Sequence, residues 1–251
     1  YLPLLQGDDS QLYATALPLL GAYDDPRVTD ALTDAWCNGP TLEVRRMAAE
    51  QLARPRAAAL TGETLELLLN LAQRAELAEC GVAFALLAHA DDPRAAAVLT
   101  QALRRAEPVV RAKAARVAPV KPVLPLVQDP DPQVRAVVAG RLAELGTSGV
   151  KPLLDLLADP ETEVVAAALR ALGTVGGAQA AAALITGAAD RHEPVRLAAV
   201  QGLGLYLRRR KDDNALRALR QAALQGELRT RIAALTELQG ELRTRIAALA
   251  E

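Results

Sequence analysis

Histidine and cysteine, the side chains that most often act as bases, nucleophiles and metal ligands, are scarce in this sequence. The histidines are His89 and His192, and the cysteines are Cys37 and Cys80. The cysteines have neither metal-ligand spacing nor a disulfide framework, so we interpret both as small buried hydrophobes. His192-Glu193 fits a polar pair at a helix start, and His89 fits a cation at a helix end. No Gly-rich phosphate loop or Gly-x-Ser-x-Gly elbow is present. The sequence therefore predicts no catalytic residues, no metal and no cofactor.

The composition favours helices and argues against a dedicated nucleic-acid binder. Apolar residues make up 51% of the 251 residues but aromatic residues only 2%, and the abundant Ala and Leu are strong helix formers. The 29 basic and 30 acidic residues give a net charge of −1, whereas nucleic-acid binders are usually clearly basic. No uncharged apolar run of about 18 residues appears, so we expect no transmembrane helix and no membrane partner. No secretory signal is visible, and we expect a cytoplasmic location.

One helical motif recurs along the whole chain. Its clearest copy is 131–142, where a turn residue and Pro precede Val134-Arg135, and apolar residues follow Val134 at four and eight positions. This spacing puts three apolar residues on one helical face. The first apolar anchors of the copies are Leu12, Val44, Ala78, Val110, Val134, Val164, Val195 and Leu228. They lie 32, 34, 32, 24, 30, 31 and 33 residues apart, which fits two helices and two turns per repeat.

Helix start and stop signals fall between these anchors. Asp as N-cap followed by Pro is a strong start signal, and it occurs at Asp25, Asp92 and Asp159. Glycines that we expect to form left-handed helix caps are Gly21, Gly146 and Gly173. The sequence therefore predicts an all-α fold: one α-solenoid (α-α superhelix) of about eight short helix pairs, each a helix A followed by a helix B, across residues 1–251.

Three segments carry a resemblance to a known family. Residues 92–99, 132–136 and 194–199 read DPRAAAVL, PQVRA and PVRLAA. They resemble HEAT repeats, and most closely the short bacterial HEAT-like repeats of the phycobilisome-lyase type. The matching residues are structural, so the resemblance implies a fold rather than a function. HEAT-repeat deoxyhypusine hydroxylases use several His-Glu motifs to hold two irons, and the single His192-Glu193 cannot supply that ligand set.

An arginine follows the first anchor in five repeats. These arginines are Arg45, Arg111, Arg135, Arg196 and Arg229. In HEAT proteins the equivalent arginine bonds to loop aspartates in a ladder along the stack, and Asp131 and Asp159 stand where such a ladder needs them. We interpret the row as structural, because functional arginines rarely recur at the repeat period.

Binding residues are expected on the other face of each helix B, which lines the concave side of such solenoids. The candidates lie one before, three after and six after the anchors: Glu43, Met47, Glu50, Lys113, Arg116, Gln133, Glu163, Arg170 and Arg231, with Val137, Gln201 and Glu227. This row is mixed in sign. A mixed-sign surface suits a protein partner with complementary charges, whereas a DNA-holding groove should be steadily basic.

Two places depart from the regular repeat. Pro119, Pro122 and Pro125 fall in the shortest interval, which predicts a compressed repeat near 111–134 with a short helix A. At the C-terminus, residues 224–237 recur as 238–251 with thirteen of fourteen positions identical. Fourteen residues make nearly four helical turns, so the duplicated segment 224–251 can keep one apolar face. The residues expected on that face are Leu228, Ile232, Leu235, Leu242, Ile246 and Leu249.

These observations favour a non-enzymatic scaffold or adaptor that holds a protein partner on the concave face. An alternative is a DNA-binding HEAT-like protein of the DNA glycosylase type, centred on Lys113, Arg116 and the basic run 208–211. Trp36 and Asp34 argue against that enzyme, because residues two apart face different sides of a helix. A third hypothesis, a bilin lyase or chaperone-like subunit, rests on the repeat resemblance alone.

Overall fold

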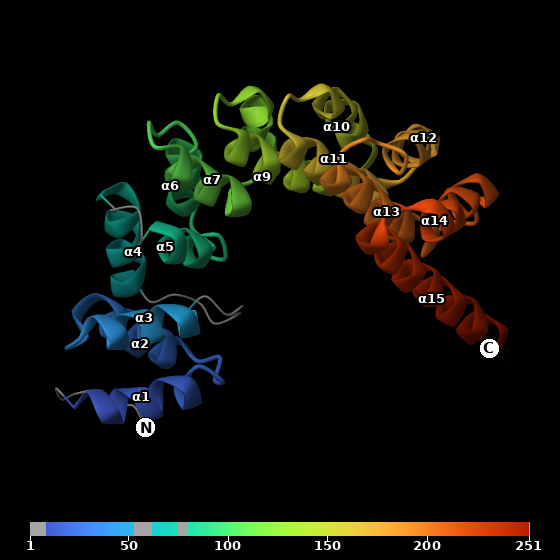
Figure 1. Ribbon diagram of the computed structural model, residues 1–251. Coiled ribbons are helices and arrows are strands. Elements are labelled where there is room, and N and C mark those ends of the chain that lie inside the picture. The colour runs from blue at the N-terminus through green and yellow to red at the C-terminus, as the bar shows by residue number, and fades with distance from the viewer. Residues whose placement is uncertain (1–8, 53–61, 75–79, 251) are drawn as a thin grey trace. The chain divides into compact units, whose positions relative to one another are not determined.

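Helices form all the regular secondary structure of the computed structural model, which describes residues 9–52, 62–74 and 80–250 (Figure 1). The chain divides into two compact units, Tyr1–Pro119 and Val120–Glu251. The division falls inside the shortest repeat interval, directly after Pro119. Each unit is a stack of helix pairs and is described by itself.

The first unit stacks three helix pairs onto a single first helix. In its described residues the helices are α1 (Ser10–Leu20), α2 (Pro26–Asn38), α3 (Leu42–Leu52), α4 (Gly62–Arg74), α5 (Cys80–Leu87), α6 (Pro93–Ala102) and α7 (Pro108–Val117). Helix α2 packs on α3, α4 on α5 and α6 on α7, while α1, α3, α5 and α7 contact one another in turn. The helices that carry the anchors thus form one layer, and their partners form the other.

The second unit repeats this plan with irregular first partners. Its elements are α8 (Val120–Val123), the 3-10 helix η2 (Leu124–Gln128), α9 (Pro132–Leu142), η3 (Ala143–Gly149), α10 (Val150–Asp155), η4 (Leu156–Ala158), α11 (Thr162–Val175), α12 (Ala178–Gly187), α13 (Glu193–Leu207), α14 (Asp213–Gln225) and α15 (Leu228–Ala250). Helices α9, α11, α13 and α15 contact one another in turn and form the B layer (Figure 1). In the compressed repeat, helix A is only the four-residue α8 followed by η2, because Pro122 and Pro125 interrupt the helical hydrogen bonds.

Aspartates cap helices at two of the three expected Asp-Pro positions. Asp25 and Asp92 each accept the backbone N–H two residues on, at 2.8 Å, and start α2 and α6. The expectation for Asp159 is wrong. Helix α11 begins at Thr162 with Glu161 at the N-cap, and Asp159 instead accepts the Glu161 N–H at 3.0 Å, so it closes the turn before the helix.

One of the three expected left-handed glycines has a positive φ. Gly146 has φ of 57°, whereas Gly21 is right-handed with φ of −57°. Gly173 lies inside α11, and the left-handed glycines that follow that helix are Gly176 and Gly177, at φ of 75° and 99°. Gly176 terminates α11. Gly173 therefore does not cap the helix, and instead allows a neighbouring helix to approach closely.

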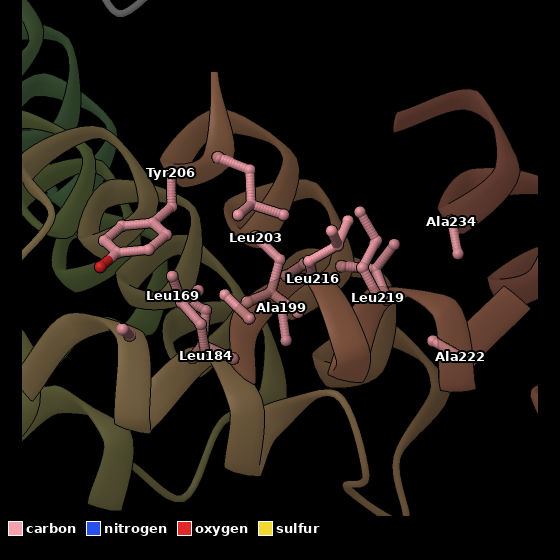
Figure 2. Packing of buried hydrophobic residues seen from close by; sticks show 14 of the residues in the cluster. Leu169, Leu184, Ala199, Leu203, Tyr206, Leu216, Leu219, Ala222 and Ala234 are labelled. Atoms are coloured by element: carbon pink, nitrogen blue, oxygen red, sulfur yellow. The ribbon is translucent and has the colours of Figure 1, made fainter. Parts of the chain in front are cut away.

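The apolar anchors build the core in the middle of each unit. The described first anchors between the two ends of the chain are all buried: Val44, Val110, Val134, Val164 and Val195. In the second unit Val195 belongs to a continuous cluster with residues of α11, α12, α13 and α14, in which Leu169, Leu184, Leu203 and Leu219 pack together (Figure 2). Trp36 is buried and so serves the core, Cys37 is half-buried, and Ala78 and the Cys80 side chain lie outside the described residues.

The first and last anchors are exceptions. Leu12 is exposed because α1 turns its neighbour Tyr13 inward. Leu228 and Ile232 are also exposed, because α15 packs through Thr230 and Ala234. The expected apolar face of this helix therefore exists, but its described members do not lie in the core.

Candidate functional site

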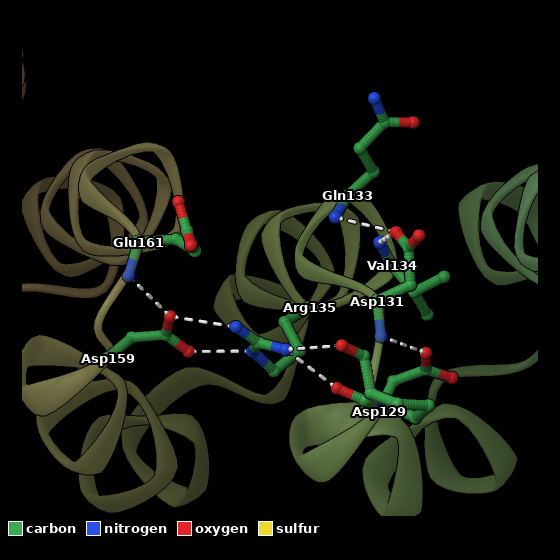
Figure 3. A network of polar contacts seen from close by, with 8 residues as sticks. Asp129, Asp131, Gln133, Val134, Arg135, Asp159 and Glu161 are labelled. Atoms are coloured by element: carbon green, nitrogen blue, oxygen red, sulfur yellow. Dashed lines mark hydrogen bonds and ion pairs between the residues drawn. The ribbon is translucent and has the colours of Figure 1, made fainter.

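A polar network built on Arg135 joins two neighbouring repeats (Figure 3). From the first turn of α9, the Arg135 guanidinium donates to the Asp129 and Pro130 carbonyl oxygens, at 2.8 and 3.2 Å. Its other edge donates to both carboxylate oxygens of Asp159 in the next repeat, at 2.7 and 2.9 Å. The side chains are only 13% and 6% exposed. Such a bidentate pair fixes orientation as well as distance, so the network holds α9 and the loop before α11 in register.

The network changes the acidity of its members. The hydrogen bonds from Arg135 lower the pKa of Asp159 below its ordinary value, against the opposing effect of burial, and the Glu161 N–H adds to the lowering. The same pair raises the pKa of Arg135. Both groups are therefore charged at neutral pH, as a structural ion pair requires.

This arrangement does not continue as a regular ladder. Val165 stands in α11 where an arginine would reach the following loop, and the aspartate of that loop, Asp190, instead accepts the His192 N–H at 2.7 Å and contacts its ring Nδ1 at 3.1 Å. Arg196 makes the same bonds to the preceding loop as Arg135 does, donating to the Asp190 and Arg191 carbonyl oxygens at 2.9 and 2.8 Å. Its partner in the next repeat is Glu227, at 3.1 Å. Arg111 likewise donates to the carbonyl oxygens six and five residues before it.

Several predicted ladder positions need correction. Asp131 is the N-cap of α9, accepting from the Gln133 and Val134 N–H groups, and it is the Asp129 carbonyl that receives Arg135. Arg45 and Arg229 are exposed and make no side-chain hydrogen bond among the described residues. On α15 it is Arg231 that bonds back to the preceding helix, donating to the Ala223 carbonyl at 3.2 Å. The rotation of α15 that buries Thr230 explains this shift.

The open face of the second unit is the side of α9, α11 and α13 that their partner helices leave uncovered. Gln133, Glu163, Arg170 and Gln201 are all exposed there, one helical stripe from each helix. A Cβ added at Gly140 of α9 would meet no atom within 4 Å, so the space beside this residue is open. Glu163 and Arg170 make no side-chain hydrogen bond or ion pair among the described residues, although they lie seven residues, about 10 Å, apart on one helix.

Apolar side chains lie between these polar ones. Val137, Leu197 and Leu205 are half-buried on the same stripes. The two leucines lie outside the positions counted from the anchors, which on α13 include the buried Ala198 instead. Their three- and four-residue spacing from Gln201 was the signal that could have found them. Apolar patches with isolated polar and charged groups are typical of transient protein interfaces.

Two helices of this face, α11 and α13, pack closely against each other. Helix α11 crosses α13 at Gly173 and Gly202, where a Cβ on Gly173 would lie 2.8 Å from the Gly202 carbonyl carbon. Glycine is required here because the two backbones approach too closely for any side chain. The stripes of α11 and α13 therefore keep a fixed spacing.

Some of the binding candidates in the first unit already contact other residues of the chain. Glu43 and Glu50 of α3 are exposed, and Glu50 pairs with Arg46 at 3.3 Å. Met47 is half-buried between them. Of the pair on α7, Arg116 is exposed and Lys113 is half-buried. A Cβ on Gly81 would lie 3.4 Å from the Lys113 side chain, so that lysine lies over α5.

The basic run 208–211 is partly neutralised. Arg208 pairs with Glu237 at 3.1 Å. Arg210 lies over the Tyr206 ring, 5.5 Å from its centroid, and donates to the Val175 carbonyl at 3.2 Å. Arg209 and Lys211 are exposed. The run thus holds loops together as well as presenting charge.

A hollow of about 450 Å³ lies beside the Arg196–Glu227 pair, between α12 and α14, and is lined by Ile185, Ala218 and Gln221. It contains no nucleophile or paired carboxylates. Among the described residues, no group of three or more His, Cys, Asp or Glu side chains could hold a metal ion. No helix in the described part of the chain is both long and apolar enough to span a membrane.

These stacked helix pairs define an α-solenoid. A family model described as HEAT repeats matches residues 120–204, in agreement with the resemblance seen in the sequence of that part. Among solved structures, the X-ray structure of YibA from Escherichia coli is 18% identical, covers 97% of this chain and 91% of that chain, and has a TM-score of 0.59. That likeness shows the fold alone.

Two further solved structures are similar at lower TM-scores. The complex of CpcE and CpcF of phycocyanin lyase from Nostoc sp. PCC7120 is 21% identical over 87% of this chain and 91% of that chain, with a TM-score of 0.48. Human deoxyhypusine hydroxylase is 16% identical over 96% and 94%, with a TM-score of 0.44. No curated protein matches the sequence.

Proposed function

We propose that this chain is a non-enzymatic scaffold that holds a protein partner on the open face of α9, α11 and α13. The observation that carries the proposal is the exposed, unpaired Glu163 and Arg170 on a helix that close packing holds rigid. Rigid presentation lowers the ordering cost of binding. Opposite charges with no internal partner can each take a complementary charge from a partner without breaking an existing ion pair.

The half-buried Leu197 and Leu205 beside these charges supply apolar contact area. The partner that fits such a face carries an apolar patch flanked by a basic group for Glu163 and an acidic group for Arg170. An α-helix is well suited, because its side chains repeat every three to four residues and can follow the Glu163–Arg170 spacing.

The test is quantitative capture from a lysate of the native host on the immobilised full chain. We expect a protein that the wild type retains and that Arg170→Glu and Glu163→Lys each lose, because reversing a charge replaces an attraction with a repulsion. The matched control is Arg209→Glu, a charge reversal at an exposed residue outside the open face, which should retain the protein. Equal retention by all four chains would contradict the proposal.

The same purified chain separates the alternatives. A nucleic-acid binder would bind duplex DNA with an affinity that falls steeply as salt rises, and Arg209→Glu would weaken it while Arg170→Glu of the open face would matter less. A bilin-handling protein would show bilin absorbance after incubation with the pigment. We expect neither signal, and turnover of any substrate would refute the non-enzymatic role.

A further inference from the structure

The last helix carries an apolar stripe that its own unit leaves uncovered. Leu228, Ile232 and Leu235 of α15 are 71%, 56% and 51% exposed. They follow one another at four and three residues, so they lie on one side of the helix. We call these three residues the α15 stripe.

The opposite side of α15 is already used. Ala234 and Thr230 are buried against the unit, and Glu237 pairs with Arg208 of α13. Thr230 is buried although its hydroxyl makes no hydrogen bond, while three larger apolar residues face outward. The helix is therefore seated through its small residues, and the stripe remains available to another molecule.

The stripe belongs to a heptad pattern. With Leu228 and Leu235 at position d and Ile232 at a, the duplicated segment continues the pattern at positions 239, 242, 246 and 249, and only Gln239 is polar. The duplicated block of fourteen residues equals two heptads, so the duplication preserves this register. Isoleucine at a with leucine at d favours two-stranded parallel coiled coils.

The charges beside the stripe select the orientation of a second helix. In a parallel pair, position g faces the e position five residues on in the partner, so position 231 (Arg) meets 236 (Thr), and position 238 (Leu) meets 243 (Arg). In the fully overlapped antiparallel pair, g faces g and e faces e. That pairing would set Arg against Arg at positions 231 and 245, and again at positions 229 and 243.

We propose that a second copy of this chain binds the α15 stripe, and that the two α15 helices form a parallel coiled-coil dimer. The surface is self-complementary, as a two-fold interface requires. The α15 stripe shares no residue with the open face of α9, α11 and α13, so the dimer would carry two copies of that face.

Sedimentation equilibrium of the full chain tests the dimer. We expect the wild type to dimerise, and Ile232→Lys to raise the dissociation constant by about 100-fold or more, because two lysines would enter the apolar seam. The matched control is Leu42→Lys on α3, where the native leucine is 77% exposed; it should dimerise like the wild type. Unchanged helical circular dichroism of Ile232→Lys excludes misfolding. A wild-type chain that stays monomeric at every concentration overturns the proposal.

Disulfide crosslinking tests the orientation, in a chain whose Cys37 and Cys80 are replaced by alanine. In a parallel dimer position a meets itself across the seam, so Ile232→Cys alone should form a linked dimer on mild oxidation, while Arg217→Cys on α14 should not. Crosslinking that needs Ile232→Cys and Leu242→Cys together would indicate an antiparallel pair and overturn the parallel one. None of these variants alters Glu163 or Arg170. Failure of the dimer proposal is therefore distinguishable from failure of the proposed partner-binding face.

Discussion

The middle of the second unit and its last helix use the same sequence motif in opposite ways. In α9, α11 and α13 the first anchor is buried, as Val195 shows, and the helices pack closely enough to require Gly173 and Gly202. In α15 the equivalent Leu228 is exposed, and small residues hold the helix instead. A repeat motif therefore defines an apolar face but does not determine what covers that face.

The largest expected difference is in how much the Arg135–Asp159 and Arg196–Glu227 ion pairs contribute to stability. Arg135→Met should lower the free energy of unfolding by about 3 kcal/mol, because it leaves the buried Asp159 carboxylate without its partner. Glu227→Gln, at the α15 end, should change it by less than about 0.5 kcal/mol, because that carboxylate is exposed. Urea unfolding followed by circular dichroism measures both. Equal losses of unfolding free energy in the two variants would contradict the difference between the middle of the second unit and its last helix.

Close packing gives the next largest effect. Gly173→Ala should cost about 2 kcal/mol of unfolding free energy, because the new methyl group would push against the Gly202 backbone. The matched control is Gly140→Ala in α9, which has open space around it and should stabilise by about 0.5–1 kcal/mol through helix propensity. A Gly173→Ala variant as stable as the wild type would contradict the close crossing of α11 and α13.

A smaller effect of the opposite sign is expected on α15. Thr230→Val should raise the free energy of unfolding by about 1 kcal/mol, because it replaces a buried hydroxyl without a hydrogen bond by a methyl group of similar shape. Thr236→Val on the exposed side of the same helix is the control and should change little. Destabilisation by Thr230→Val would show that the hydroxyl has a partner.

The smallest expected effect is a change with pH, at acidic pH alone, in the contribution of Asp159 to the free energy of unfolding. Because the folded state lowers the pKa of Asp159 below 3.8, its contribution to stability is fully present above about pH 4 and is lost as the pH falls through the lowered value. The difference in unfolding free energy between the wild type and Asp159→Asn should therefore be constant from pH 7 to pH 5 and shrink in stronger acid. A difference that persists unchanged in acid would refute the charged pair.

The local pattern around Arg135 explains what the sequence could predict. Periodicity predicted the helices, whereas the resemblance to HEAT repeats implied Asp159 as a candidate partner of the arginine row. The pattern did not identify Asp129, whose backbone carbonyl oxygen accepts from Arg135, because Asp131 at the N-cap of α9 is the more conspicuous acidic residue. The equal spacing of six residues from Asp129 to Arg135 and from Asp190 to Arg196 was the missing signal.

Two other features could not be predicted, for different physical reasons. Gly173 and Gly176 both follow an apolar anchor region, and only the helix length decides which one ends α11. The rotation of α15 depends on a balance between burying Ala234 with Thr230 and burying Leu228 with Ile232. A sequence pattern identifies which residues share a face, but tertiary packing decides which face turns inward.

The concentration dependence of the thermal unfolding midpoint tests the central contrast most directly. If the α15 stripe binds a second copy, the midpoint of the wild type rises with protein concentration, because association stabilises the folded state by mass action. The midpoint of Ile232→Lys should then stay constant, and Val195→Ala should lower the midpoint at every concentration while keeping its upward slope. A wild-type midpoint that is independent of concentration would contradict this account of α15.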